Sequence, residues 1–347
     1  MAMQVGQINT SELFNKIVPY KQDKSKKILL SCDLNEFWPT KRNLIHELIC
    51  QFPSLHFQTA YTSDEQKFHI LDSDATFGIP SANIFELNRK LTWVHHPVSG
   101  FELQPNHPII DSDVILTNAP NAHVISMAEY VFATMLSLTH KIPEHIKDQQ
   151  NRIWDSSKYL STIQELTGQT LGIVGYGEVG KAIAVRAFGF GMNVYGISRT
   201  PKTTGTNFAI VWTPEKIEAL LKISDWLVIA APLTKETRNL INEARIQLIK
   251  PNAYVIILSR AHILDEKALV TRLINGNLAG AVFDNFETGT IEESSPLWDM
   301  DNVIITPHTS SMSINLERDR FNIFRENLDR YINGKPFIRV ADKTRGY

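Results

Sequence analysis

The sequence predicts an α/β protein of two domains, each a doubly wound parallel sheet covered by helices. Short apolar runs typical of buried strands alternate with helical patterns along most of the chain, as they do in parallel sheets. A glycine-rich turn joins one of these strands to the helix that follows it. The length of 347 residues is enough for two separate hydrophobic cores.

The first domain is predicted to begin at about residue 27, after an N-terminal extension of residues 1–26. A helix is expected over residues 41–52, and this part of the chain has no glycine-rich turn of its own. Its strand-like runs are residues 28–32, 56–60, 75–79, 91–95 and 114–117.

A long helix with one apolar face is predicted after Asn121, ending before Pro143. We interpret this helix as the crossover and hinge between the two domains. His123, near its start, is interpreted as a structural histidine rather than a functional one. The apolar positions of the helix are Met127, Tyr130, Val131, Met135 and Leu138.

The clearest signal lies in residues 171–199, where a strand, a turn, a helix and a second strand follow one another. The turn is Gly175-Tyr-Gly177-Glu-Val-Gly180. Gly175 permits the tight turn, Gly177 lets the backbone approach a pyrophosphate, and Gly180 lets the helix pack closely on the sheet. The N–H groups and positive dipole end of the helix then bind phosphate. The unit predicts a dinucleotide cofactor, and an ordinary tight turn is the alternative.

The residue that closes the second strand of this unit selects the dinucleotide. A site for NAD has an acidic residue here for the ribose 2′-hydroxyl, and that residue would repel a 2′-phosphate. The strand instead ends in Ser198 and Arg199, with Lys202 just beyond. Because arginine binds phosphate with paired, charge-assisted hydrogen bonds, the sequence favours NADPH. NAD, with Arg199 as a solvated loop residue, is the alternative.

The remaining elements complete a predicted sheet of seven strands in the second domain. Helices are expected over residues 214–221, 240–249 and 266–274. Because the strands are expected to be parallel, their carboxyl ends share one edge, where open α/β sheets bind ligands. The candidate strands are residues 171–174, 193–197, 208–211, 226–230, 253–258, 279–283 and 303–306.

Three reactive side chains follow strands on this predicted ligand side: Arg260, Asp284 and His308. An arginine can hold a carboxylate through two hydrogen bonds, and a protonated histidine can donate to a carbonyl oxygen as hydride arrives. The set therefore predicts reduction of a 2-oxo acid, with the histidine as base in the reverse reaction. In the first domain, the loop with Ser99 and Gly100 either binds the substrate carboxylate through backbone N–H groups or is a plain turn.

Ordered motifs over most of the chain resemble the D-isomer-specific 2-hydroxyacid dehydrogenase family, which includes glyoxylate/hydroxypyruvate reductases and phosphoglycerate dehydrogenases. Segments 93–101 and 117–130 are similar to the substrate loop and hinge helix of that family. The motifs of the second domain are GYGEVG from Gly175, APLTKETRNLIN from Ala231, LSRAHILDEKAL from Leu258, GAVFDNFE from Gly280 and SPLWDMDNVIITPH from Ser295.

The resemblance implies a Rossmann cofactor domain, residues 121–310, inserted into a flavodoxin-like substrate domain. The substrate domain would consist of residues 27–120 and 311–347. A C-terminal helix over about residues 314–332 would pack on the N-terminal domain. A homodimer through the cofactor domain would be usual.

The same resemblance implies roles for individual residues. Arg260 would bind the substrate carboxylate together with the backbone of Ser99 and Gly100, and His308 would be the acid/base. Asp284 would face the nicotinamide amide. The predicted cofactor-binding residues are Gly175, Gly177, Glu178, Val179, Gly180, Ser198, Arg199, Ala231, Pro232, Leu258, Ser259 and Asp284.

The chain departs from the family pattern at three positions. The family's glutamate, which sustains the protonated histidine, is replaced by Gly289. Ile257 and Ala261 stand where the family commonly has asparagine and glycine. An anionic partner favours imidazolium, so its loss would make the acid scarcer at neutral pH. Three nearby carboxylates would replace it only if the loop rearranges: Glu287, Glu292 and Glu293.

Composition and charge exclude other classes of protein. A net charge of −2 offers no basic surface for nucleic acid or anionic lipid, and no run of about 18 apolar residues occurs. Cys32 and Cys50 lack metal-ligand spacing, so we predict buried thiols, no metal and a reducing compartment. With 43% hydrophobic and 21% charged residues and no signal peptide, the chain is expected to be cytoplasmic.

Three functions follow, in decreasing order of support. The first is NADPH-dependent reduction of a small 2-oxo acid, such as glyoxylate or hydroxypyruvate, to its D-2-hydroxy acid by Arg260 and His308. The second is a dinucleotide-binding sensor or interaction protein with weak or no catalysis, which Gly289 supports. The third is an NAD-linked dehydrogenase of phosphorylated hydroxy acids.

Overall fold

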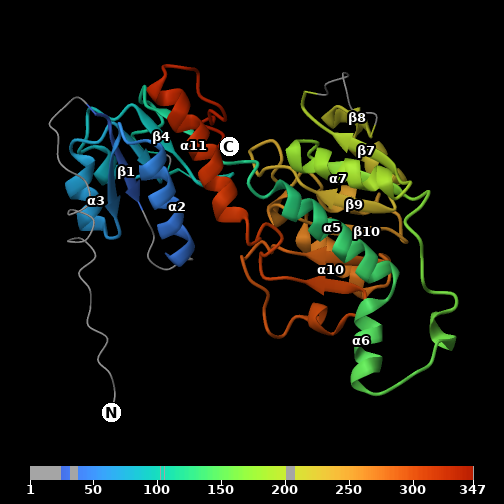
Figure 1. Ribbon diagram of the computed structural model, residues 1–347. Helices are drawn as coiled ribbons and strands as arrows, with labels where there is room; N and C mark the ends of the chain where they lie inside the picture. The colour runs from blue at the N-terminus through green and yellow to red at the C-terminus, as the bar shows by residue number, and fades with distance from the viewer. Residues whose placement is uncertain (1–24, 32–37, 102, 105, 201–207, 347) are drawn as a thin grey trace, which may run out of the picture. The chain divides into compact units, whose positions relative to one another are not determined.

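The computed structural model (Figure 1) describes residues 25–31, 38–101, 103–104, 106–200 and 208–346, without the side chains of residues 38–41. The predicted N-terminal extension, except for its last two residues, lies outside this part of the chain, as do Cys32 and Lys202. The chain forms two compact units, residues 1–93 and 94–347. The domain limits at residues 120 and 310 stay predictions.

The first unit begins with an inner strand, β1, that pairs in parallel with β2 on one side and β3 on the other. Ile28, Leu29 and Leu30 of β1 are buried, as the apolar run predicts. The elements of this unit are β1 (Lys27–Ser31), α2 (Trp38–Gln51), β2 (His56–Ala60), α3 (Ser63–Ile70), β3 (Ala75–Phe77) and α4 (Ala82–Phe85). With β4 (Trp93–His95) and β5 (Ile115–Thr117), the sheet has the order β2-β1-β3-β4-β5.

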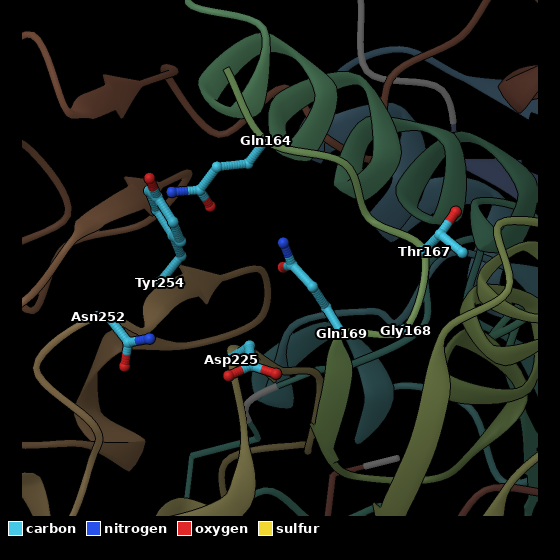
Figure 2. A pocket seen from close by; sticks show the side chains of 7 residues that line it. All are labelled: Gln164, Thr167, Gly168, Gln169, Asp225, Asn252 and Tyr254. Carbon is cyan, nitrogen blue, oxygen red and sulfur yellow. The ribbon is translucent and has the colours of Figure 1, made fainter. Parts of the chain in front are cut away.

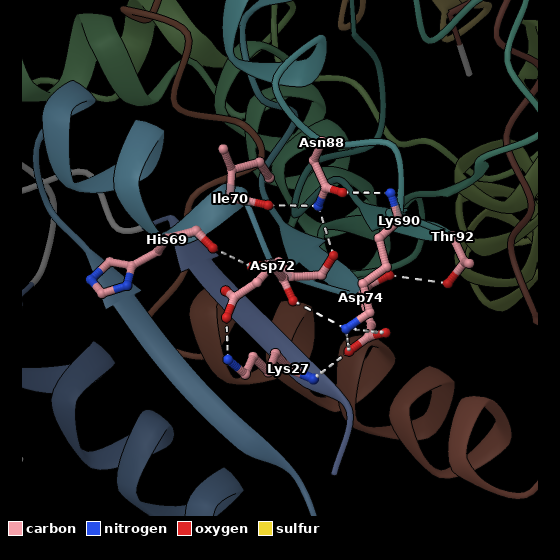
Figure 3. A network of polar contacts seen from close by, with 9 residues as sticks. Lys27, His69, Ile70, Asp72, Asp74, Asn88, Lys90 and Thr92 are labelled. Carbon is pink, nitrogen blue, oxygen red and sulfur yellow. Dashed lines mark hydrogen bonds and ion pairs between the residues drawn. The ribbon is translucent and has the colours of Figure 1, made fainter. Parts of the chain in front are cut away.

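A polar network fixes the start of β1 to the turn after α3 (Figure 3). The backbone N–H of Lys27 donates to the carboxylate of Asp74 at 2.7 Å, and the Lys27 ammonium pairs with Asp72. Asp74 also pairs with the ammonium of Lys90 at 3.1 Å. One carboxylate thus joins two segments that lie far apart in the sequence.

The prediction that Cys50 is buried is wrong. Leu44 and Leu48 lie on the buried face of α2, and Cys50, two residues after Leu48, lies on the opposite face. Its thiol is exposed, 3.8 Å from Nδ1 of His46. The helical period therefore decides the exposure of this cysteine.

The second unit is built on a seven-stranded sheet, as the sequence predicts, in the order β12-β11-β10-β9-β6-β7-β8. Every described pair of its strands is parallel. From β6 the chain moves outward to β7 and β8 and then returns to β9, on the other side of β6. The strand order therefore reverses between β6 and β9, the place where open α/β sheets bind ligands. The strands are β6 (Thr170–Val174), β7 (Asn193–Ile197), β8 (Ile210–Trp212), β9 (Trp226–Ile229), β10 (Tyr254–Ile257), β11 (Gly280–Phe283) and β12 (Val303–Ile305).

Helices cover both faces of this sheet. Along β9, Trp226 and Val228 belong to one apolar cluster, and Leu227 and Ile229 to the other. Burial on both faces explains why the strands are continuous apolar runs. The first face packs on α5 (Val124–Thr139) and α7 (Glu178–Gly189), and the second on α8 (Ile217–Ile223), α9 (Glu243–Ile246) and α10 (Glu266–Ile274) (Figure 1).

The predicted hinge helix is present, whereas the predicted helix over residues 240–249 is mostly not. The hinge helix, α5, ends at Thr139, and a separate helix, α6 (Ile142–Gln150), begins with Pro143 in its first turn. The segment 240–249 is helical only over α9, because the Asn242 side chain caps the helix there. The preceding Ile241 instead forms a parallel bridge with Leu264.

The C-terminal helix, α11 (Leu316–Ile332), confirms the predicted helix over 314–332. Its Phe324 ring is fully buried and lies 5.2 Å from the ring of His95 in β4. Within the described residues, no helix is long and apolar enough to cross a membrane.

We expect Asn88→Ala to lower the free energy of unfolding by about 2 kcal/mol, because it removes two buried hydrogen bonds and takes the amide donor from the buried Ser73 carbonyl. The buried amide of Asn88 donates to the carbonyls of Ile70 at 2.6 Å and Ser73 at 2.7 Å (Figure 3). Urea denaturation measures the change. The control, Asn83→Ala, alters an exposed side chain of the same unit and should change stability by less than about 0.5 kcal/mol. Equal losses in the two variants would contradict the assignment.

Candidate functional site

The three glycines after β6 differ in the space around them, and these differences agree with the tasks predicted for them. Gly175 has φ +102°, and a Cβ there would lie 2.4 Å from the backbone nitrogen of Ala231. A Cβ on Gly180 would lie 2.7 Å from the carbonyl oxygen of Gly175, whereas a Cβ on Gly177 would meet no atom within 4 Å. Gly175 and Gly180 are therefore needed for close packing, and the space beside Gly177 is open.

That open space lies at the start of α7. Gly177 is the N-cap of this twelve-residue helix, and Gly177 and Glu178 are exposed. Val179 is partly buried behind them. The first N–H groups of a helix bind anions such as phosphate. The turn thus has the room, the donors and the dipole that a pyrophosphate requires.

Arg199 follows β7, whose end is held by a hydrogen bond from Ser198 N–H to the carbonyl of Trp212 (2.9 Å). Its side chain is exposed. The hydroxyl of Thr234 lowers the pKa of Glu236, and the charges of Arg345 and Arg199 lower it further. A carboxylate therefore lies within electrostatic reach of Arg199.

The loops after β9 and β10 flank the glycine turn. Ala231 is buried and Pro232 is exposed. Leu258 is buried, and the hydroxyl of Ser259 donates to the carbonyl of Ile229 at 3.1 Å. These predicted cofactor-binding residues therefore lie at the carboxyl edge of the sheet, next to the point where the strand order reverses.

Arg260, Asp284 and His308 follow β10, β11 and β12, which are neighbours in the sheet. The Arg260 guanidinium is partly exposed and donates to the carbonyl of Ser259 at 3.2 Å. His308 is exposed and has a left-handed backbone, with φ +56°. The sheet thus brings these predicted residues to one edge.

Asp284 is almost fully buried and holds the segment that carries His308. Its Oδ1 accepts hydrogen bonds from the Thr306 hydroxyl at 2.6 Å and from the backbone N–H groups of Thr309 at 2.8 Å and Ser310 at 3.2 Å. Several donors are needed to offset the cost of burying a carboxylate. Asp284 therefore positions the His308 loop, and its predicted contact with the nicotinamide stays a prediction.

The long helix α5 is bonded to the same segment. The Tyr130 hydroxyl lies 2.7 Å from the Thr306 hydroxyl, which donates to Asp284, so Tyr130 must be the donor to Thr306. Burial raises the pKa of Tyr130 to about 12, although the hydrogen bond with Thr306 acts to lower it. Ser126 donates to the carbonyls of Ser310 (2.9 Å) or Met312 (2.8 Å). Two side chains of α5 thus hold residues 306–312.

Asn285 contacts the imidazole, and sequence reasoning missed it. Its side-chain nitrogen lies 3.4 Å from Nδ1 of His308, and its side-chain oxygen accepts from the N–H of Ala261 at 3.4 Å. One amide therefore joins the loop after Arg260 to the histidine. The one sequence signal for it was its position next to Asp284 at a strand end, which does not show that it contacts His308.

The predicted substrate loop lies after β4. The carbonyl of Ser99 accepts from the buried Asn118 amide, and the carbonyl of Val98 accepts from the N–H of Ala119 at 3.2 Å. Burial lowers the pKa of His96 to about 4, although a hydrogen bond to the backbone of Gly100 acts to raise it. The loop is thus held from several sides, and its role in binding the substrate stays a prediction.

Comparison with known proteins decides the family. Residues 132–310 match the family described as "D-isomer specific 2-hydroxyacid dehydrogenase, NAD binding domain". The chain is also 32% identical over 260 residues to a protein named glyoxylate reductase from Pyrococcus furiosus, covering 73% of this chain and 76% of that one. The chain belongs to the D-isomer specific 2-hydroxyacid dehydrogenase family. The predicted family and fold class are thereby confirmed.

Two further similarities bear on this dehydrogenase. A D-3-phosphoglycerate dehydrogenase from Methanocaldococcus jannaschii is 32% identical over 233 residues, which cover 67% of this chain and 44% of that protein. A solved D-isomer specific 2-hydroxyacid dehydrogenase from Xanthobacter autotrophicus Py2, in complex with NADPH and MES, is 27% identical. The match covers 93% of this chain and 100% of that one, with a TM-score of 0.78.

The dehydrogenase departs from its family beside the imidazole. Gly289 is exposed, has φ +79°, and a Cβ there would meet no atom within 4 Å. Glu287, in the same loop, donates its backbone N–H to Glu266 at 2.8 Å. Among the described residues, the Asn285 amide forms a hydrogen bond with the His308 ring. The Asn285 amide is thus a neutral partner of the imidazole, and position 289 supplies no carboxylate.

His123 lies closer to the site than the sequence suggested. Burial lowers its pKa to about 4, and the positive charges of Arg320 and Arg260 lower it further. It lies directly before α5, without a capping hydrogen bond from its side chain. The His123 imidazole is thus buried and within electrostatic reach of Arg260, and its interpretation as a structural histidine stays a prediction.

A cavity of about 400 Å³ opens at the other edge of the dehydrogenase sheet (Figure 2). It lies at the amino ends of β6, β9 and β10, and Gln164 and Gln169 extend their amides into it. Gln169 accepts from the Trp226 indole at 2.6 Å, and Asp225 binds Lys250 at 2.8 Å. These polar groups are satisfied within the protein. No set of His, Cys, Asp and Glu side chains in the described residues is arranged to hold a metal.

We expect Gly180→Ala to destabilise the protein by about 1–3 kcal/mol, because the new methyl group would collide with the Gly175 carbonyl. Gly177→Ala is the matched control in the same turn. It should change the free energy of unfolding by less than about 1 kcal/mol, because the space beside it is open. Thermal unfolding of both variants measures the difference, and an unaffected Gly180→Ala protein would refute the close packing.

Proposed function

We propose that this dehydrogenase reduces a small 2-oxo acid, of the glyoxylate or hydroxypyruvate type, to its D-2-hydroxy acid with NADPH. The observation that carries the proposal is the placement of Arg260, Asp284 and His308 after three neighbouring parallel strands. All three follow strands beyond the point where the strand order reverses, on the same edge as the glycine turn. The relative from Pyrococcus furiosus, named glyoxylate reductase, supports this substrate class.

The substrate carboxylate would be held by Arg260. Its guanidinium is partly exposed, as a group that receives a substrate must be, and can donate two parallel hydrogen bonds to a carboxylate. The backbone of Ser99 and Gly100 would hold the same end of the substrate. Because these groups fix the carboxylate, the reactive carbonyl next to it is held in a defined orientation.

His308 would supply the proton. An imidazole within hydrogen-bond reach of a carbonyl oxygen can donate its proton as negative charge develops there, and can take the proton back in the reverse reaction. When the Asn285 amide donates to Nδ1, the neutral ring carries its proton on Nε2. Asp284 fixes the loop that carries the ring. Bound NADPH would supply the hydride.

Two observations support NADPH. Arg199 is exposed at the end of β7, where a carboxylate would be expected for NAD. The Xanthobacter autotrophicus relative was solved in complex with NADPH. The open space at Gly177 and the exposed start of α7 fit the pyrophosphate of either dinucleotide. NAD therefore stays the alternative, as in a dehydrogenase of phosphorylated hydroxy acids.

A second function is favoured by one observation. Gly289 and the Asn285 amide leave the imidazole without the carboxylate that the family pattern leads one to expect. The chain would then be a dinucleotide-binding sensor or interaction protein with weak or no catalysis. Steady-state assays with glyoxylate, hydroxypyruvate, pyruvate and a branched 2-oxo acid discriminate, because a sensor would bind NADPH and turn over none of them.

We also propose that the protein is cytoplasmic and forms a homodimer through its cofactor domain. Apolar side chains are exposed on α6, the helix labelled in Figure 1, and on the segment after it. Exposed apolar patches mark interaction sites. The exposed side chains are Ile142, Ile146, Ile153, Trp154, Leu160 and Ile163.

We expect His308→Ala to lower kcat for 2-oxo acid reduction by about a hundredfold or more, because the general acid is lost. NADPH binding should stay within about twofold of the wild type, since the phosphate turn is untouched. Stopped-flow turnover and fluorescence titration with NADPH measure the two effects. A variant that keeps wild-type turnover would remove His308 from the mechanism.

We expect Arg199→Asp to lower kcat/KM for NADPH by about tenfold or more and to raise it for NADH, because the carboxylate repels a 2′-phosphate. The control is Arg89→Asp, an exposed arginine of the first unit with the same change of charge. It should leave the ratio of the two kcat/KM values unchanged. An unchanged ratio in Arg199→Asp itself would exclude Arg199 as the residue that selects the cofactor.

A further inference from the structure

The C-terminal residues 339–346, here called the C-terminal strap, lie along β5. Val340 forms an antiparallel bridge with Thr117, and the N–H of Ala341 donates to the carbonyl of Leu116 at 2.8 Å. The N–H of Asn118 donates to the carbonyl of Arg339 at 3.0 Å. The strap is therefore joined to β5 as a short antiparallel strand, by backbone hydrogen bonds.

The end of the strap is a tight turn organised by Asp342. Its carboxylate accepts from the Thr344 hydroxyl at 2.7 Å and from the N–H groups of Thr344 (3.0 Å) and Arg345 (3.1 Å). The hydroxyl of Thr344 lowers the pKa of Asp342, and the backbone hydrogen bonds lower it further. The N–H of Gly346 donates to the carbonyl of Asp342 at 2.9 Å. These bonds fix the orientation of the Gly346 peptide.

The turn contacts the loop predicted to bind substrate, residues 98–101, here called the substrate loop. The N–H of Phe101 donates to the carbonyl of Gly346 at 3.0 Å. Gly346 has φ +77°, and a Cβ there would lie 2.4 Å from the carbonyl oxygen of Phe101. A Cβ on Gly100 would lie 3.8 Å from the carbonyl oxygen of Gly346. Only a residue without a side chain fits this position in the turn.

The substrate loop has further contacts at both of its ends. Asn118 and Ala119 bond to the carbonyls of Ser99 and Val98, which lie nearer to β4. The ring of Phe101 packs edge-on against that of His96 at 5.6 Å. The strap therefore supplies the backbone hydrogen bond at the far end of the loop, beyond Gly100. Without it, the N–H of Phe101 would lose its backbone acceptor.

We propose that the C-terminal strap is a positioning element of the substrate site, which holds Ser99 and Gly100 in place through the Gly346–Phe101 hydrogen bond. The inference rests on the proposed function, because it assigns this loop to the substrate carboxylate. Among the described residues, the strap forms no backbone hydrogen bond with the glycine turn or with the segment that carries His308. Its Arg345 is also within electrostatic reach of Glu236, the carboxylate near Arg199. Because the backbone contacts of the strap are with the substrate loop, we expect its main effect on the binding of the 2-oxo acid and only a small one on NADPH.

Gly346→Ala tests the proposal in the full-length protein. The alanine is strained at φ +77° and collides with Phe101, so the turn must leave the loop. We expect KM for the 2-oxo acid to rise about tenfold, with kcat and the Kd of NADPH within about threefold of the wild type. The matched control is Gly334→Ala, which has φ +62° and no atom within 4 Å of the new methyl group. It should leave KM unchanged.

Amide hydrogen exchange of residues 98–101 gives a second readout that needs no activity. Removal of residues 343–347, and Gly346→Ala, should both raise the exchange rate of this loop at least about tenfold, while Gly334→Ala should not. Unchanged KM together with unchanged exchange would overturn the proposal. A wild-type protein that turns over no 2-oxo acid would refute the proposed function instead, and the exchange rates would then decide alone whether the strap holds the loop.

Discussion

Parallel pairing is the constraint on which the rest of the second unit depends. It requires helices on both faces of the sheet, so the strands are buried on both sides and read as continuous apolar runs. It also places every carboxyl end on the same edge. Residues separated by about 50 positions, such as Arg260 and His308, then come to the same edge of the sheet, because each follows a strand and only β11 lies between the two strands. The close approach of Gly175 to Ala231 shows how tightly β6 and β9 meet at that edge.

The buried carboxylate of Asp284 is the second organising feature. Burying a carboxylate costs several kcal/mol unless donors offset it, and here a hydroxyl and two backbone N–H groups converge on it. These donors all come from residues 306–310, so the interaction that satisfies the charge also shapes the loop. The left-handed backbone of His308 is unfavourable for most residues with a side chain, by about 1 kcal/mol. The hydrogen bonds from Thr306 and Thr309 to Asp284, on either side of His308, stabilise that conformation.

Much of this could be predicted from the sequence because it depends on local patterns. The strands of the seven-stranded sheet follow from apolar runs, and the distinct environments of Gly175, Gly177 and Gly180 follow from their spacing. Asn285 could not be found in this way, because its contact with His308 depends on the distance between two loops. The C-terminal strap was missed for a different reason: it has no apolar periodicity and is held by backbone hydrogen bonds, which any sequence can make.

The bonds from Tyr130 and Ser126 to residues 306–312 have a mechanical consequence. They make the imidazole-bearing segment a rigid extension of α5, whereas α11 begins only at Leu316. A rotation of α11 about the short link between Met312 and Leu316 would leave the ring where it is. His308 therefore keeps its position relative to the glycine turn, because α7, which follows that turn, also packs on α5.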